Sequence, residues 1–286
     1  MIISNIKSII QIFYGELFNF KIPFKTRVYR ILARSQISQL FEKYYISKRK
    51  KVKIETFENN FIIIDNNIAT KELHENGITL GLNLNENIVE RIINFIQNKN
   101  FRFNRNPNKQ IKFSERYNYK DLYILNYMNP HLENETIKEI LLNKELISVI
   151  KNYLKVDPVL EWSQIYWSLP FKDESGKTLT PPNNEFGYHY DIDGFRFLKV
   201  FFYLTDVTEI HGPHVFIKNS GKKTLYKALN RRINEREIEK KFQNKKIIIT
   251  GKKGSGFIED TSFYHKGTNP IKERGILTCL YNIDKW

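Results

Sequence analysis

The sequence predicts an α+β fold with a mainly β core of the jelly-roll or barrel type and flanking helices. The second half of the chain carries many short apolar runs with turns between them, which is typical of antiparallel sandwiches and barrels. Helical spacing of apolar residues is concentrated in the first half, and one further helix is expected around 233–242. With 286 residues, the chain is long enough to bury a large core. The strands expected in the second half are 159–167, 199–204, 215–217, 247–249, 256–258 and 276–281.

Helices and short strands are expected to alternate between residues 57 and 154. Asn85 begins a helix with apolar residues along one side. A second helix begins at Asn134 or Thr136 and continues to about Leu154. Residues 98–120 are polar and basic with aromatic residues interleaved, a length and mixture that favour a long binding loop. The strands expected here are 61–64, 78–82 and 122–125.

Residues 1–55 differ from the rest of the chain in charge. They hold 12 Lys and Arg against 3 Asp and Glu, so +9 of the total net charge of +15 lies there. The first 13 residues also place apolar side chains at near-helical spacing. We interpret 1–55 as a basic, helical N-terminal extension and 56–286 as the jelly-roll domain. Packing of the extension on that domain is the favoured interpretation. Peripheral contact with an anionic membrane surface is the alternative.

The basic charge and the cysteine content bear on partners and compartment. A charge of +15 is compatible with a nucleic-acid or anionic-lipid partner, or with a compositional bias toward Lys, Asn and Ile. We favour the bias and do not expect a nucleic-acid partner. Cys279 is the only cysteine, which excludes an intramolecular disulfide and fits a reducing compartment, so we expect a cytoplasmic protein. No apolar stretch approaches the length needed to span a bilayer.

A His-x-Asp motif and a distant histidine carry the chemistry of the chain. His189 and Asp191 lie between predicted strands, His265 follows far downstream, and Arg274 stands nine residues after it. Each of these residues alone is weak evidence for a metal site, but the whole set in this order indicates an iron(II) site. Two neutral imidazoles and one carboxylate leave three coordination positions for a chelating keto acid and O2. Asp193 is an alternative carboxylate, but the spacing favours Asp191, and we interpret Asp193 as a turn residue.

Further motifs accompany these residues: Tyr203-Leu204-Thr205-Asp206-Val207, Gly212-Pro213-His214-Val215, Asp260-Thr261 and Lys266-Gly267. On these motifs, together with the His-x-Asp motif, His265 and Arg274, residues from about 57 to 283 resemble the phytanoyl-CoA dioxygenase family of iron(II)- and 2-oxoglutarate-dependent oxygenases. This resemblance implies a double-stranded β-helix, which is a jelly-roll core, and hydroxylation of a C–H bond with succinate and CO2 as coproducts. Many relatives have Gly-Ser-His where this chain has Asn219-Ser220-Gly221, a departure that concerns loop and substrate shape and not metal binding.

The resemblance also implies roles for individual residues. The implied ligands of Fe(2+) are His189, Asp191 and His265. Arg274 would bind the distal carboxylate of 2-oxoglutarate, since a guanidinium pairs with a carboxylate through two hydrogen bonds. Lys199 lies in an otherwise apolar strand and either shares that carboxylate or extends to the edge of the sheet. Thr268 is a candidate for a further hydroxyl contact with the cosubstrate.

The predicted function is hydroxylation of a small-molecule or carrier-linked substrate. The first alternative is a nucleic-acid oxidative demethylase of the same chemistry. Such enzymes often carry a second arginine shortly after the first, and Gly275-Ile276-Leu277-Thr278 contains none. The second alternative is a non-catalytic jelly-roll binding module, which the intact triad disfavours. His211 and His214 flank Gly212-Pro213 and are interpreted as turn residues, not as a second metal pair.

Overall fold

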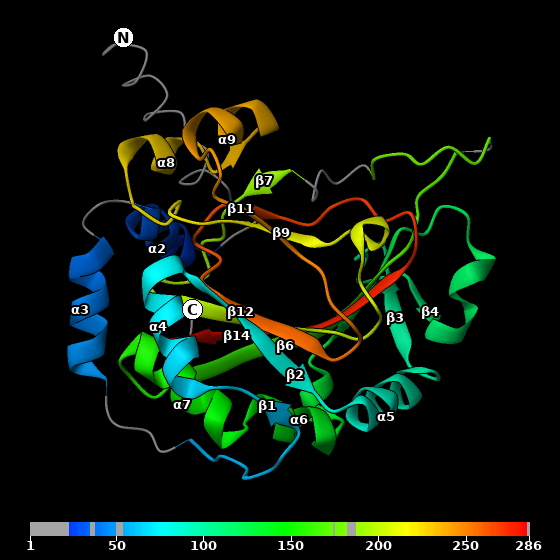
Figure 1. The fold of residues 1–286 in the computed structure, drawn as a ribbon, viewed down its shortest axis with the longest axis horizontal. Helices are drawn as coiled ribbons and strands as arrows, with labels where there is room; N and C mark the ends of the chain where they lie inside the picture. Colours follow the sequence, from blue (N-terminus) through cyan, green and yellow to red (C-terminus); the bar gives the residue numbers. More distant parts are fainter. Residues whose placement is uncertain (1–22, 35–37, 50–53, 174, 182–186, 285–286) are drawn as a thin grey trace.

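The computed structural model describes residues 23–34, 38–49, 54–173, 175–181 and 187–284 (Figure 1). These residues form two antiparallel sheets with helices around them, as the sequence predicts. The larger sheet has the strand order β1-β2-β12-β8-β14-β6-β5-β3-β4. Its strands are β1 (Ile62–Ile63), β2 (Ile78–Leu84), β3 (Asn100–Phe103), β4 (Gln110–Lys112), β5 (Ile124–Met128), β6 (Val159–Ser168), β8 (Phe197–Tyr203), β12 (Ser255–Glu259) and β14 (Arg274–Asn282).

The smaller sheet lies over one face of the larger one, above it in Figure 1, and has the order β10-β7-β13-β9-β11. Helices α4 to α7 lie on the opposite side of the larger sheet in that view. The smaller sheet comprises β7 (Tyr188–His189), β9 (His214–Ile217), β10 (Arg232–Ile233), β11 (Lys246–Ile249) and β13 (His265–Lys266). The helices are α2 (Phe24–Arg34), α3 (Ser38–Lys48), α4 (Asn66–Asn76), α5 (Glu86–Ile96), α6 (Glu135–Leu141), α7 (Lys144–Leu154), α8 (Leu225–Leu229) and α9 (Glu235–Lys241), with 3-10 turns at Phe113–Asn118, Pro130–Leu132 and Glu209–His211.

Strand β8 shows how the sequence separates the two faces of the larger sheet. Successive side chains of a strand point to opposite faces. Leu198, Val200 and Phe202 are fully buried in the core that the helices share with the sheet. The alternate residues face the smaller sheet: the Tyr203 hydroxyl donates to the Ile249 carbonyl at 2.7 Å, and the Phe201 ring lies 5.4 Å from that of His214. Lys199 is another of these alternate residues, so its side chain also lies on the face of the larger sheet that is turned toward the smaller sheet.

The helix predicted from Asn134 to about Leu154 is two helices, α6 and α7. The break is at Asn143, which is buried and whose side-chain oxygen accepts from the amides of Glu145 and Leu146 as the N-cap of α7. Its side-chain amide donates to Asn59 at 3.0 Å. The apolar periodicity continues across the break, so periodicity alone did not reveal it.

The prediction of a long loop over residues 98–120 is wrong. The segment folds as the hairpin β3–β4 followed by a 3-10 turn, at the edge of the larger sheet. Phe101 and Phe103 are buried, because alternate residues of β3 face the core. Phe113, which begins the 3-10 turn, is buried as well. The expectation of a helix within 233–242 is confirmed by α9.

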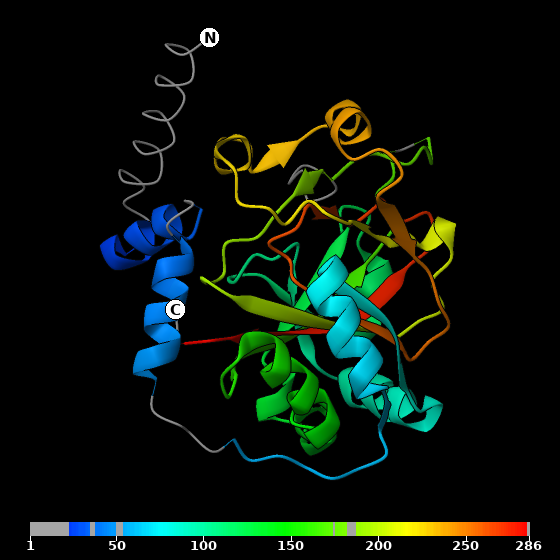
Figure 2. The same cartoon turned by 60° about the vertical axis from the view of Figure 1, so that its left-hand side comes forward.

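Helices α2 and α3 pack on the loop that follows the His-x-Asp motif (Figure 2). The Phe195 ring is 4% exposed and lies 5.4–5.9 Å from the rings of Tyr29, Phe41 and Tyr45. Glu42 accepts a hydrogen bond from Arg196 at 2.7 Å. These contacts involve the described part of 1–55 only, and the apolar stripe of the first 13 residues lies outside it. No helix in the described ranges is both long and apolar enough to cross a membrane.

A chain that begins at Glu55 is expected to be less stable than the full chain. Removal of α2 and α3 exposes Phe195, and exposing a large apolar side chain costs about 1.5–3 kcal/mol. That loss corresponds to a fall in Tm of roughly 3–12 °C for a chain of this size. Thermal unfolding of both chains measures it. An unchanged Tm, together with salt-sensitive sedimentation of the full chain on anionic liposomes, would instead support peripheral membrane attachment.

Candidate metal centre

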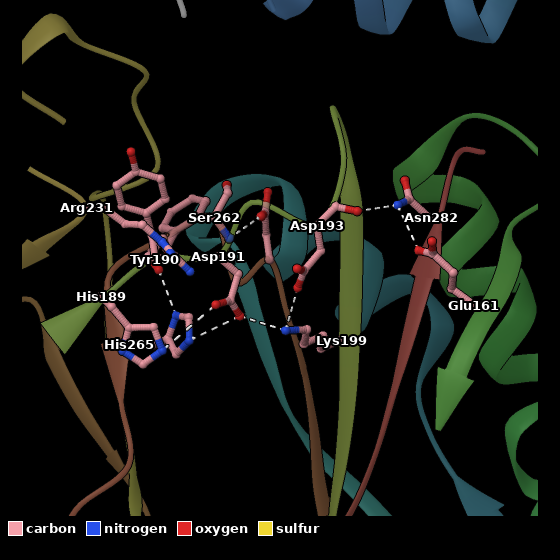
Figure 3. Close-up of polar contacts among 12 residues, drawn as sticks. Glu161, His189, Tyr190, Asp191, Asp193, Lys199, Arg231, Ser262, His265 and Asn282 are labelled. Atoms are coloured by element: carbon pink, nitrogen blue, oxygen red, sulfur yellow. Dashed lines mark hydrogen bonds and ion pairs between the residues drawn. The ribbon is translucent and has the colours of Figure 1, made fainter. Parts of the chain in front are cut away.

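Two strands of the smaller sheet bring the two predicted histidine ligands together. His189 ends β7, His265 begins β13, and the two residues are direct partners in the antiparallel register. Their rings lie 4.5 Å apart between centroids. Asp191 follows two residues after His189, and its amide donates to the Thr261 carbonyl at 2.7 Å, which ties the motif to the segment before His265. Figure 3 shows the Asp191 carboxylate between these rings and Lys199.

The three side chains present one donor atom each to a common point. Nε2 of His189 lies 3.9 Å from Oδ1 of Asp191, and Nε2 of His265 lies 3.5 Å from Oδ2. All three donor atoms lie within 4.8 Å of one another. This separation and this set of two imidazoles and one carboxylate suit a divalent transition metal with open positions, among which iron(II) is typical.

The second nitrogen of each ring fixes which nitrogen can bind a metal. Nδ1 of His189 lies 2.9 Å from the Gly187 carbonyl oxygen, and Nδ1 of His265 lies 2.9 Å from that of Phe263. A carbonyl oxygen only accepts, so each Nδ1 carries a proton. In the neutral ring, the lone pair is therefore on Nε2 and points to the shared centre, an arrangement common among metal-binding histidines.

The charges at the centre follow from burial and from neighbouring groups. Burial and the proximity of His265 lower the pKa of His189 to about 3, so this ring is neutral at physiological pH. Burial opposes ionisation of Asp191, but Lys199 and His265 outweigh it and hold the pKa of the carboxyl well below its usual range. For His265, burial lowers the pKa and Asp191 raises it, with a net rise. A metal ion bound to Nε2 of His265 would take the place of the proton that this nitrogen carries in the protonated ring.

A cavity of about 410 Å³ contains the three residues and also Arg274, the first residue of β14. Arg274 is buried, and its Nη1 donates to the Gly212 carbonyl. Its buried Nε has no hydrogen-bond partner, and no carboxylate of the described residues forms an ion pair with the guanidinium. Burial lowers the pKa of this group. A buried guanidinium with an unsatisfied donor at a cavity is suited to the carboxylate of a small acid.

Lys199 lies at the metal end of this cavity and not beside Arg274. In the register of the larger sheet it is opposite Leu280, whereas Arg274 is at the start of β14, six residues earlier. Its Nζ lies 2.7 Å from Oδ2 of Asp191 and 2.7 Å from Oδ2 of Asp193. The sequence interpretation of Asp193 as a turn residue missed this contact. The only signal for it was that His189, Asp191 and Asp193 are at alternate positions.

Thr268 lies outside the cavity, and His214 departs from its sequence interpretation as a turn residue. The Thr268 hydroxyl donates to the Pro213 carbonyl at 2.8 Å, and the residue does not line the cavity, so its contact with a cosubstrate stays a prediction. His214 is not in a turn. It begins β9, lines the cavity and stacks on His265 at 5.5 Å between ring centroids. Its Nε2 lies 3.0 Å from the buried carboxylate of Glu259.

Solved structures share this arrangement of sheets and helices, although no family model and no curated protein matches the sequence. EctD from S. alaskensis with bound Fe is 14% identical with a TM-score of 0.53, covering 82% of this chain and 83% of its own. Its structure with 2-oxoglutarate and 5-hydroxyectoine gives 14% identity and a TM-score of 0.54, with 82% of each chain covered. HygX from Streptomyces hygroscopicus with nickel and 2-oxoglutarate is 10% identical with a TM-score of 0.50, covering 74% of this chain and 85% of its own. The likeness shows a shared fold. At these identities, any role of the site in this chain has to be argued from its own residues.

Proposed function

We propose that this protein is an iron(II)- and 2-oxoglutarate-dependent dioxygenase. One observation carries the proposal: two imidazole Nε2 atoms and one carboxylate converge in the same cavity as a buried arginine with an unsatisfied donor. A site that binds only a metal would not need the arginine, and a site that binds only a diacid would not need the two histidines. The EctD and HygX structures, which contain Fe or nickel and 2-oxoglutarate on this fold, support it. The two facing sheets are proposed to form a double-stranded β-helix, and the reaction to use O2.

Each residue of the site has a distinct part in this proposal. His189, Asp191 and His265 would hold Fe(2+), and Arg274 would orient 2-oxoglutarate by its distal carboxylate. With both bound, the centre would couple oxidation of the keto acid by O2 to oxidation of the substrate: one oxygen atom would enter succinate as CO2 is released, and the other would enter a C–H bond of the substrate. Both sheets supply the walls of the cavity, the larger one from β5, β6, β8 and β14 and the smaller one from β7, β9, β10 and β13.

The proposed substrate is a small molecule, or the end of a carrier-linked one. The cavity of about 410 Å³ is within the range of small-molecule sites. Hydroxylation is the proposed outcome. The binding-module alternative differs from this proposal in one measurable respect, because an inert fold consumes no cosubstrate.

Formation of succinate from 2-oxoglutarate tests the function. The purified protein is expected to release succinate only when iron(II), 2-oxoglutarate and O2 are all present, slowly without substrate and faster with extracts that contain it. Removal of iron by a chelator should stop the release, and added iron(II) should restore it. A protein that binds neither iron(II) nor 2-oxoglutarate would reject the proposal and favour the binding module.

A further inference from the structure

Lys199 lies between two carboxylates, only one of which is a predicted metal ligand. Its Nζ is 2.7 Å from an oxygen of Asp191 and 2.7 Å from an oxygen of Asp193 (Figure 3). The two oxygens are therefore no further apart than twice that distance. The ammonium group also lies 5.3 Å from the centre of the Trp162 ring, on the neighbouring part of the cavity wall. Asp193 is thus a second carboxylate close to the metal centre.

The backbone aims the Asp193 side chain into the cavity. Tyr190 and Ile192 are buried in the core, whereas His189, Asp191 and Asp193 all line the cavity. His189 ends β7, and the chain bends at Asp193 before β8 begins at Phe197. The segment is also anchored behind Asp193. The fully buried Asn282 donates its side-chain amide to the Asp193 carbonyl, and a Cβ on the next residue, Gly194, would lie 2.5 Å from the same side chain. Only the absence of a side chain at Gly194 allows this close approach.

We propose that Lys199 is a positioning residue that holds Asp193 out of the coordination sphere of the metal. This inference rests on the proposed function. The centre needs three open positions, two for the chelating keto acid and one for O2. A second carboxylate on the metal would occupy one of them. The ammonium group of Lys199 gives Asp193 a cationic partner other than the metal, and it engages Oδ2 of Asp191 so that Oδ1 remains for the metal.

The consequence of losing Lys199 follows from the chemistry of partly buried carboxylates. The side chain of Asp193 is 34% exposed. Without Lys199, the cations left in the cavity would be the metal, held two residues away by Asp191, and the guanidinium groups of Arg105, Arg231, Arg232 and Arg274. An ionised group in such a site is stabilised by the closest opposite charge. We therefore expect the metal to gain a ligand and the cosubstrate to lose a position. The role assigned to Lys199 by the resemblance, a contact with the distal carboxylate, predicts no gain of a metal ligand.

The test compares Lys199→Met, Asp193→Asn and the double variant, each loaded with cobalt(II) in place of iron. We measure cobalt(II) affinity, the visible absorption of bound cobalt(II) and calorimetric binding of 2-oxoglutarate. Lys199→Met is expected to bind cobalt(II) at least threefold more tightly, with an altered spectrum, and 2-oxoglutarate more than tenfold more weakly. In the double variant, 2-oxoglutarate affinity should return to within about threefold of the wild type, because the competing carboxylate is gone.

Two results would overturn the inference. One is a Lys199→Met protein with unchanged cobalt(II) spectrum and cosubstrate affinity. The other is a double variant that binds 2-oxoglutarate as weakly as Lys199→Met, which would indicate a direct contact of Lys199 with the cosubstrate. Lys253→Met is the matched control, since Lys253 forms ion pairs with Glu86 and Glu90 outside the cavity. If the wild type itself binds neither cobalt(II) nor 2-oxoglutarate, the proposed function fails, which is a distinguishable outcome.

Discussion

Replacement of His265 by alanine is expected to abolish stoichiometric iron(II) binding and all formation of succinate. The same result is expected for His189→Ala. Each change removes one of three ligands, and loss even of an outer-shell partner costs about 10–100-fold in metal affinity. A loss of more than about 100-fold is therefore expected, measured by metal content after dialysis and by succinate release.

The fold of both variants is expected to persist, because the two sheets are held by a large apolar core and not by the metal. Far-UV circular dichroism and thermal unfolding check this. His211→Ala is the matched control: this histidine lies in a 3-10 turn outside the cavity, with its Nδ1 2.9 Å from the Thr208 hydroxyl. Full iron occupancy and turnover in both His189→Ala and His265→Ala would show that the triad is wrongly assigned.

Local sequence signals predicted the parts of the site that lie on single strands. The His-x-Asp spacing predicts that His189 and Asp191 lie on one side of an extended segment, and the fold brings His265 to them. The turn after β7 and the apolar run of β14 were equally visible as sequence patterns. Such features depend on a period of two and on turn residues, which a single sequence contains.

Features that depend on the pairing of distant strands were not predictable. His214 reaches the centre because β9 pairs with β13. The contact between Asp193 and Lys199 spans only six residues, but it depends on the bend by which the chain passes from β7 in the smaller sheet to β8 in the larger one. The break between α6 and α7 depends on a contact between Asn143 and Asn59, 84 residues apart.

Arg274→Ala is expected to raise the concentration of 2-oxoglutarate needed for half-maximal turnover by well over tenfold. The guanidinium is buried, and no carboxylate among the described residues compensates it. Loss of a buried, hydrogen-bonded charge pair costs about 2–5 kcal/mol. Most of the effect should appear in the KM for 2-oxoglutarate, since iron(II) binding does not involve Arg274. Steady-state succinate formation over a range of 2-oxoglutarate concentrations measures the shift.

Two further variants separate cosubstrate binding from a purely structural role. Arg274 also donates to the Gly212 carbonyl, so its removal leaves a buried acceptor without a partner and lowers stability. Arg274→Lys keeps the charge and a donor but not the planar fork, and it should recover only part of the 2-oxoglutarate affinity. Arg91→Ala removes an arginine that bonds Thr136 far from the cavity and should leave the KM unchanged. If Arg274→Ala and Arg274→Lys lose stability but keep the wild-type KM, then Arg274 supports the fold, and the cosubstrate carboxylate has another partner.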